Sequence, residues 1–173
     1  MDAQSFRDVM AASPSPVTVI TTADGGGPAG CTVSAFMSLS LEPRLVGVAL
    51  DRRSSVLPRV EAAGKFGVNI LAATQSEVAL RFAGAGVDRF ADLAWFLDTS
   101  VPRLYGTSGW LRCGLTSIVE AGDHLLLMGE VLDAACSSPF PMVYASRLFG
   151  GHTGLREDDL SDQARLLAAL ARF

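Results

Sequence analysis

Short apolar runs, separated by turn-forming residues, recur along most of the chain. Runs of about four to eight apolar or β-branched residues between turn signals are typical of strands. They predict strands over 16–22, 29–34, 45–50, 66–71 and 141–145, and a hairpin of two longer strands over 110–120 and 124–133. The run 45–50 carries no polar residue, which suits a strand buried on both faces.

Helical character is confined to fewer segments. The segments 5–12, 54–63 and 75–83 are predicted helices, and the first ends before Pro14 because proline disfavours the helical conformation of the preceding residue. Beyond Gly154, leucines at 160, 167 and 170 recur at helical spacing. Helices and strands do not alternate regularly, so the pattern favours a mainly β protein, an antiparallel β-barrel with helices, over a doubly wound parallel sheet.

A glycine-rich stretch at 25–30 satisfies the Gly-x-Gly-x-x-Gly spacing of dinucleotide-binding loops. That motif requires a helix to begin within the loop, so that the helix N-terminus faces the pyrophosphate. Here Pro28 and the β-favouring segment 31–34 follow instead. The stretch is therefore interpreted as a hairpin turn.

The composition narrows the class of protein. The chain has 173 residues, 49% of them hydrophobic and 18% charged, which fits one folded domain with a sizeable core. Its net charge of −4 argues against a nucleic-acid partner, and no apolar run approaches the ~18 residues of a membrane span. The three cysteines are too widely spaced for a paired redox or metal motif, and no metal site is indicated. Without a secretory signal pattern, a cytoplasmic location is expected.

Hydroxyl side chains fall at even positions along one segment: Thr32, Ser34, Ser38 and Ser40. On a continuous extended chain, this spacing places them on one face. Such an edge can bond the polar side of a flat heteroaromatic ring, with Phe36 and Met37 over its apolar side. The alternative is a solvated strand face, because half-buried strands show the same alternation.

A second polar cluster, Arg52-Arg53-Ser54-Ser55, stands where the helix 54–63 is predicted to begin. With Ser55 as N-cap, Pro58 falls in the first turn, where its missing N–H breaks no helical hydrogen bond. A helix start with free amides, hydroxyls and nearby arginines suits a phosphate group. The alternative is a capped helix with two solvated arginines.

Taken in order, these and later motifs resemble the short-chain flavin reductase family, the FMN-binding split-barrel proteins that supply reduced flavin to two-component monooxygenases. The motifs are Pro16-Val17-Thr18-Val19-Ile20-Thr21-Thr22, Gly30-Cys31-Thr32-Val33-Ser34-Ala35-Phe36, Ser38-Leu39-Ser40-Leu41-Glu42-Pro43, Ser54-Ser55, Phe66-Gly67-Val68-Asn69-Ile70-Leu71-Ala72, Arg81-Phe82-Ala83, Asp88-Arg89-Phe90, Gly122-Asp123-His124 and Pro141-Met142-Val143-Tyr144. The likeness extends to about residue 150. No single motif is decisive, but the ordered series is specific.

The resemblance implies a mainly β, antiparallel, Greek-key-like FMN-binding split barrel over residues 1–154, followed by a helical extension over 155–173. It implies an NAD(P)H:flavin oxidoreductase that transfers hydride from NADH or NADPH to FMN or FAD. It further implies a homodimer that delivers reduced flavin to a partner monooxygenase. The residues do not indicate which flavin or which nicotinamide nucleotide is preferred.

The resemblance also implies roles for individual residues. Flavin contacts are expected from three groups: Thr32, Val33, Ser34, Ala35, Ser38 and Ser40 at the ring; Asp51, Arg52, Arg53, Ser54 and Ser55 along the ribityl chain and phosphate; Arg81, Phe82, Ala83 and Arg89 at the phosphate or adenosine side. His124 occupies the position associated with the nicotinamide face and is the candidate catalytic residue, with Tyr144 near it. As an alternative, a histidine after Gly-Asp at a hairpin turn has no catalytic part.

Two positions depart from the family pattern. Cys31 stands where methionine or another apolar residue is frequent, and Arg44 stands where a second proline is common. Two other functions stay open from the residues alone. One is a non-catalytic flavin-binding protein or flavin carrier on the same fold, and the other is an interaction protein that uses the C-terminal helix.

Overall fold

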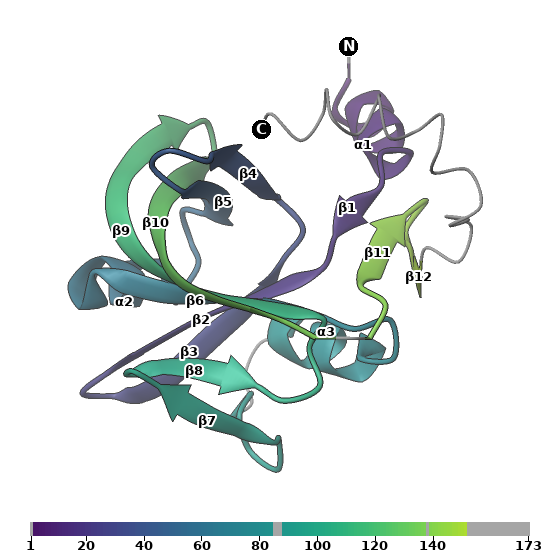
Figure 1. The fold of residues 1–173 in the computed structure, drawn as a ribbon. Coiled ribbons are helices and arrows are strands. Elements are labelled where there is room, and N and C mark those ends of the chain that lie inside the picture. The colour runs from purple at the N-terminus through teal and green to yellow at the C-terminus, as the bar shows by residue number, and fades with distance from the viewer. Residues whose placement is uncertain (1, 85–87, 138, 152–173) are drawn as a thin grey trace, which may run out of the picture.

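Strands make up most of the computed structural model, which describes residues 2–84, 88–137 and 139–151 (Figure 1). The helices are α1 (Ala3–Ala11), α2 (Leu57–Ala63) and α3 (Ser76–Ala83). The strands are β1 (Ser15–Pro16), β2 (Thr18–Asp24), β3 (Gly27–Val33), β4 (Phe36–Ser40), β5 (Leu45–Asp51), β6 (Lys65–Ile70), β7 (Trp95–Asp98), β8 (Val101–Leu104), β9 (Gly109–Ala121), β10 (His124–Cys136), β11 (Met142–Ala145) and β12 (Leu148–Gly151). The mainly β architecture predicted from the apolar runs is confirmed.

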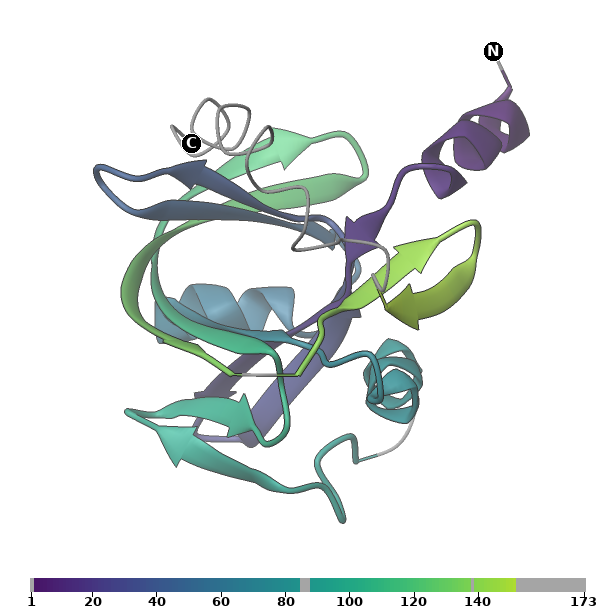
Figure 2. The same ribbon diagram turned by 45° about the vertical axis from the view of Figure 1, so that its right-hand side comes forward.

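One sheet of seven strands forms the body of the protein, in the order β3-β2-β6-β9-β10-β5-β4. Every paired strand in it is antiparallel. The long β9–β10 hairpin arches over the interior and carries the sheet around into a barrel, as the turned view shows (Figure 2). Two smaller sheets, β1-β11-β12 and β7-β8, lie outside this body.

The barrel closes where the connection between β3 and β4 meets β5. Although β3 and β5 lie far apart in the sheet order, they contact each other, and the amide of Ala49 donates to the carbonyl of Ala35 at 3.0 Å. The larger core cluster fills the inside, with Ile20, Val48, Val60, Phe66 and Leu127 almost fully buried. These apolar residues come from four strands and from α2, so helix and barrel share one core.

A second core cluster packs α3 against the outside of the barrel. Ala79 and Phe82 of this helix are buried together with Val17, Leu71 and Met142. The ring of Phe82 meets that of Phe90 edge-on, with centroids 5.0 Å apart. This packing fixes the C-terminal end of α3 beside β3.

The glycine-rich stretch is the turn of the β2–β3 hairpin, as interpreted from the sequence. Asp24 pairs with Gly27 at the end of the ladder, and the Asp24 carboxylate accepts a hydrogen bond from the amide of Gly26 at 2.8 Å. No helix begins there, so the dinucleotide-loop alternative is excluded.

Three local predictions are wrong. The segment 32–40 is not one extended chain: it breaks at Ser34–Ala35, and the two strands that it forms, β3 and β4, end up at opposite edges of the sheet order. Ser38 and Ser40 are further separated by a register shift against β5. Ser55 is not the N-cap, because Val56 takes that place and α2 begins at Leu57, one residue later than predicted, although Pro58 does lie in its first turn.

Some strands were not predicted at all. These are β7, β8, β12 and the last three residues of β10, while β1 is covered only at Pro16 by the predicted strand 16–22. The helix expected after Gly154 lies outside the described residues. In the part of the chain that the structure describes, no helix is long and apolar enough to cross a membrane.

Candidate active site

An open cavity of about 510 Å³ lies where the end of β3, the end of β5 and the end of α3 meet. This volume is within the range of about 300–1,000 Å³ that pockets for small molecules and cofactors occupy. The cavity is lined by Cys31, Thr32, Val33, Ser34, Ala35, Ala49, Leu50, Asp51, Arg53, Ser54, Ser55, Phe82, Ala83, Arg89 and His124. It combines hydroxyls, backbone groups and arginines with short apolar side chains.

The inner wall is formed by the last residues of β3 and the break after it. Thr32 Oγ1 donates to the carbonyl of Ala79 at 2.6 Å, which ties β3 to α3. Beyond Val33 the chain turns sharply, and the amide of Phe36 donates to the carbonyl of Ser34 at 3.0 Å. Ser34 and Ala35 both line the cavity, and because their carbonyls accept from the amides of Phe36 and Ala49, it is their amides that are left to face a ligand.

One side of the cavity carries a carboxylate that holds an arginine. Asp51 accepts from the amide of Arg53 at 2.8 Å and from its guanidinium at 3.1 and 2.8 Å. These bonds hold the pKa of the Asp51 carboxyl well below its usual range. Arg53 is thereby oriented at the mouth of the cavity, while its side chain stays 90% exposed.

The opposite side carries an arginine held by carbonyl groups. Arg89 Nη1 donates to the carbonyl of Gly30 at 2.6 Å, and Nε and Nη2 donate to the carbonyl of Gly84. No carboxylate within the described residues forms an ion pair with Arg89. Its positive charge is therefore positioned by neutral groups and remains available to an anion.

His124 stands at the rim, opposite Asp51 in the register of β10 and β5. Its Nδ1 lies 2.7 Å from a carboxylate oxygen of Asp123, and the ring is 42% exposed. The hydrogen bond with His124 is the main cause that lowers the pKa of Asp123. His124 thus has a fixed orientation through Nδ1, with Nε2 as the nitrogen not used in that contact.

The cavity wall includes a thiol that is not ionised. Cys31 Sγ lies 3.9 Å from Ser54 Oγ, and burial raises the pKa of the Cys31 thiol. Cys113, deeper in the core, has a pKa raised to about 12 for the same reason. Neutral thiols are poor nucleophiles, so Cys31 forms part of the wall rather than a reactive group.

The structure brings most of the predicted site residues together. Those that line the cavity are Thr32, Val33, Ser34, Ala35, Asp51, Arg53, Ser54, Ser55, Phe82, Ala83, Arg89 and His124. Their roles toward a ligand stay predictions.

Five predicted residues do not line this cavity. Ser38 and Ser40 lie on β4, beyond the break in the chain. Arg52 turns outward, where its Nε donates to the carbonyl of Gly122. Arg81 donates to the carbonyl of Ala91, and Tyr144 lies on β11 with its ring 5.4 Å from that of Phe149.

Three lining residues were missed as site residues. Ala49 and Leu50 end the apolar run 45–50, which gives no sign of an accessible strand end. Cys31 was noted only as a departure from a family pattern. Its place next to Thr32 in the same motif is the signal that points to the cavity.

The residues present fit a flavin. Ala35, Ala49 and Ala83 are at least partly exposed and offer apolar surface to a ring, and the amides of Ser34 and Ala35 can donate hydrogen bonds to its polar edge. Ser54 and Ser55 supply hydroxyls beside Arg53, which suits a phosphate. The hydrogen-bonding groups along the cavity therefore suit a ligand with a flat polar ring at one end and a phosphate at the other.

An antiparallel split barrel with such a cavity at its strand ends defines a class of protein that binds a nucleotide-like ligand. Sequence comparison identifies the particular family. Residues 10–152 match the flavin reductase like domain, and the chain belongs to this family. The resemblance drawn from the ordered motifs is confirmed.

Characterised relatives share much of the chain. It is 41% identical over 151 residues to the NADH:riboflavin 5'-phosphate oxidoreductase of Streptomyces pristinaespiralis, covering 84% of this chain and 86% of that protein. It is 38% identical over 130 residues to the reductase component of the flavin-dependent trigonelline monooxygenase of Acinetobacter baylyi. That match covers 74% of this chain but only 42% of the longer relative.

A solved structure confirms the fold. The NADH:FAD oxidoreductase SgcE6 of Streptomyces globisporus, in complex with NAD and FAD fragments, superposes with a TM-score of 0.83 at 30% identity. The superposition covers 91% of this chain and 95% of that one. The predicted flavin reductase split barrel is therefore the fold of this protein.

Proposed function

We propose that this protein is an NAD(P)H:flavin oxidoreductase, the reductase component of a two-component flavin-dependent monooxygenase. The observation that carries the proposal is the cavity at the end of β3, where the amides of Ser34 and Ala35, several hydroxyls and an arginine with no carboxylate partner among the described residues fit a flavin. The family of the chain and the activities of its named relatives support it.

In this proposal the chain contributes alignment rather than covalent chemistry. A flavin bound in the cavity supplies the acceptor for a hydride from reduced nicotinamide. Ser34 and Ala35 hold the polar edge of the ring, where negative charge grows during reduction. Ser54 and Ser55 hold the phosphate, and the apolar side chains keep water from one face of the ring.

His124 is proposed to face the nicotinamide. It stands at the rim, so a second ring entering the cavity passes beside it. With Nδ1 held by Asp123, its Nε2 is the group available to bond a carboxamide or to shield the rings from water. In this role His124 orients the hydride donor and transfers no proton.

Two aspects of assembly belong to the same proposal. The reduced flavin is released to an oxygenase partner, as the name of the Acinetobacter relative describes for that protein.

The chain is proposed to form a homodimer, because α1 has no buried residue and presents Phe6, Val9 and Met10 to solvent. Light scattering then gives twice the 18.2 kDa of one chain, and a single-chain mass contradicts the dimer.

Steady-state kinetics test the activity. Purified protein with NADH and FMN or FAD is expected to oxidise NADH well above the rate seen with free flavin alone. If flavin binds but NADH is not oxidised with any flavin–nicotinamide pair, the protein is a flavin carrier instead.

His124→Ala is expected to raise the KM for NADH while the dissociation constant for flavin stays within about twofold, since the side chain lies at the rim.

A further inference from the structure

Arg52 is the one residue of the segment 51–55 that does not line the cavity. The family resemblance predicted a flavin contact for it, as for its four neighbours. Its side chain turns instead toward the β9–β10 hairpin, where its Nε donates to the carbonyl of Gly122 at 2.8 Å. Arg52 therefore has a different role from the rest of this segment.

Two hydrogen bonds connect Arg52 to the turn of this hairpin. Besides the Nε bond to Gly122, the backbone amide of Arg52 donates to the carbonyl of Asp123 at 3.1 Å. Nη2 also lies 3.5 Å from Oε1 of Glu120, but that side chain is 84% exposed, and exposed ion pairs contribute little to stability. Arg52 therefore holds the turn mainly through its two carbonyl groups.

The turn has little other support. Gly122 and Asp123 form it, between the paired residues Ala121 and His124. Among the described residues, no other residue outside the hairpin hydrogen-bonds to Gly122 or Asp123. A Cβ atom at Gly122 would meet no atom within 4 Å beyond its chain neighbours, and the side chain of Asp123 is 92% exposed. Because packing does not fix the turn, its position beyond the strand ladder depends on Arg52.

The same turn sets the orientation of His124. A carboxylate oxygen of Asp123 lies 2.7 Å from Nδ1 of His124. In the ladder of β10 and β5, His124 is opposite Asp51, which directly precedes Arg52 in the chain. A shift of the turn therefore moves the carboxylate that holds the ring, and with it Nε2 at the rim of the cavity.

We propose that Arg52 is a positioning residue for nicotinamide binding and not a flavin ligand. It holds the turn so that Asp123 keeps Nε2 of His124 directed at the nicotinamide. The inference rests on the proposed function, in which His124 faces that ring. It replaces the contact with the ribityl chain or phosphate that the family resemblance implied for Arg52.

Arg52→Met tests this role, because it keeps the length of the stem and removes the charge and the Nε donor. The bond from the backbone amide remains. The KM for NADH is expected to rise about fivefold, within the range that one hydrogen bond contributes, while kcat and the dissociation constant for FMN change less than about twofold. Weaker FMN binding with an unchanged KM for NADH would return Arg52 to the flavin phosphate and overturn the proposal.

Arg44→Met is the matched control for the lost charge. Arg44 is exposed between β4 and β5, outside the cavity, and forms no ion pair among the described residues. This variant is expected to keep the KM for NADH within about twofold of the parent value. An equal rise in both variants would mean that Arg52 only attracts the phosphates of NADH by its charge, which contradicts a positioning role.

A double-mutant cycle tests whether Arg52 acts through His124. In a His124→Ala background, Arg52→Met is expected to change the KM for NADH less than about twofold, because the ring that Arg52 positions is gone. If the two effects multiply instead, Arg52 acts on NADH independently of His124, and the proposal fails.

Amide hydrogen exchange of the ligand-free protein gives a readout that needs no turnover. The amide of residue 52 is expected to exchange about fivefold faster in Arg52→Met, after correction for intrinsic rates, because the turn that accepts its bond opens more often. Arg44→Met should leave this rate unchanged. An unchanged rate in Arg52→Met would overturn the proposal even if NADH is oxidised. A faster rate, in a protein whose parent oxidises no NADH, supports the anchoring of the turn and rejects only the proposed function.

Discussion

A single missing side chain at Gly30 allows the cavity wall to form. A Cβ atom built there would lie 2.9 Å from Cε1 of Phe82 and 3.0 Å from the carbonyl oxygen of Ile20. The same residue offers its own carbonyl to Arg89. Phe82 and Arg89 both line the cavity, so their positions depend on close approach to this part of β3.

Gly30→Ala is therefore expected to affect binding as well as stability. The added methyl group forces Phe82 away from β3, at a cost of about 1–3 kcal/mol in the free energy of unfolding. Urea denaturation measures that loss, and titration with FMN measures the weaker binding. Gly25→Ala, in the same hairpin but with no atom near the new methyl group, is the control. Equal stability of the two variants would show that β3 yields without strain.

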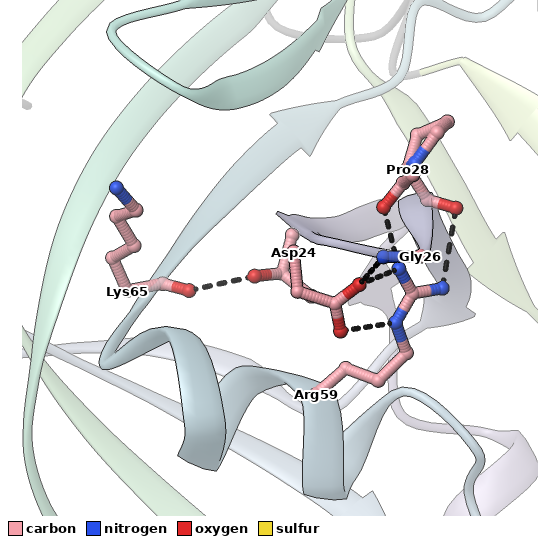
Figure 3. A network of polar contacts seen from close by, with 7 residues as sticks. Asp24, Gly26, Pro28, Arg59 and Lys65 are labelled. Carbon is pink, nitrogen blue, oxygen red and sulfur yellow. Dashed lines mark hydrogen bonds and ion pairs between the residues drawn. The ribbon is translucent and has the colours of Figure 1, made fainter.

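At the scale of elements, α2 and the β2–β3 hairpin are held together by the Asp24–Arg59 pair shown in Figure 3. The guanidinium of Arg59 lowers the pKa of the Asp24 carboxyl to about 2, against about 3.9 in an unfolded chain. A carboxyl with a lowered folded pKa stabilises the folded state above its unfolded pKa. That contribution is lost as the pH falls from about 4 to about 2.

Asp24→Asn should consequently unfold at a lower temperature than the parent protein at neutral pH. The difference between the two proteins is expected to shrink below pH ~4 and to vanish near pH ~2, because the parent carboxyl is then protonated as well. Thermal unfolding followed by circular dichroism across this range measures it. Among the described residues Glu61 forms no ion pair, so the small effect of Glu61→Gln should not vary with pH in this way. A pH-independent deficit in Asp24→Asn would contradict the electrostatic explanation.

The β9–β10 hairpin crosses the core at Gly129, next to a register shift in its ladder. A Cβ atom there would lie 2.5 Å from Cζ of Phe66, a fully buried ring. Gly129→Ala is expected to lose about 1–3 kcal/mol in urea denaturation, because the close-packed core has no room to shift. Gly150→Ala on β12, with open space around the new methyl group, should lie within ~0.5 kcal/mol of the parent. Similar losses in both would point to strand propensity instead of crowding.

The strands differ in whether they could be predicted from the sequence. The strands 45–50 and 66–71 were predictable because each is a buried run with turn signals on both sides. Short β7 and β8 were not, because β8 packs on the distant strands β2 and β6, and β7 pairs with β8. The break at Ser34–Ala35 was missed for a similar reason. The sequence shows evenly spaced hydroxyls on both sides of this break. Only the folded barrel, in which Ala35 bonds Ala49, shows that these hydroxyls do not share one face.

At the scale of the whole molecule, the candidate site arises from the curvature of the sheet. Four strands separate β3 from β5 in the sheet order, yet both contribute lining residues. The motif around Thr32 and that around Ser54 could be predicted separately from the sequence. That Phe82 of α3 and His124 of β10 join them follows from the fold, with the family resemblance as the one earlier indication.

The closure between Ala35 and Ala49 gives the bound ligand a mechanical meaning. A molecule seated in the cavity contacts β3, one edge strand of the curved sheet, and β5, the neighbour of the other edge strand, and so adds contacts across the place where the barrel closes. Amide hydrogen exchange is expected to slow most at Ala49 and its neighbours when FAD is added, because opening the ring then requires releasing the ligand. Protection spread evenly over the barrel would contradict this. If Ala49 and its neighbours are protected most, the flavin is both the molecule on which the protein acts and a ligand that stabilises the closed barrel.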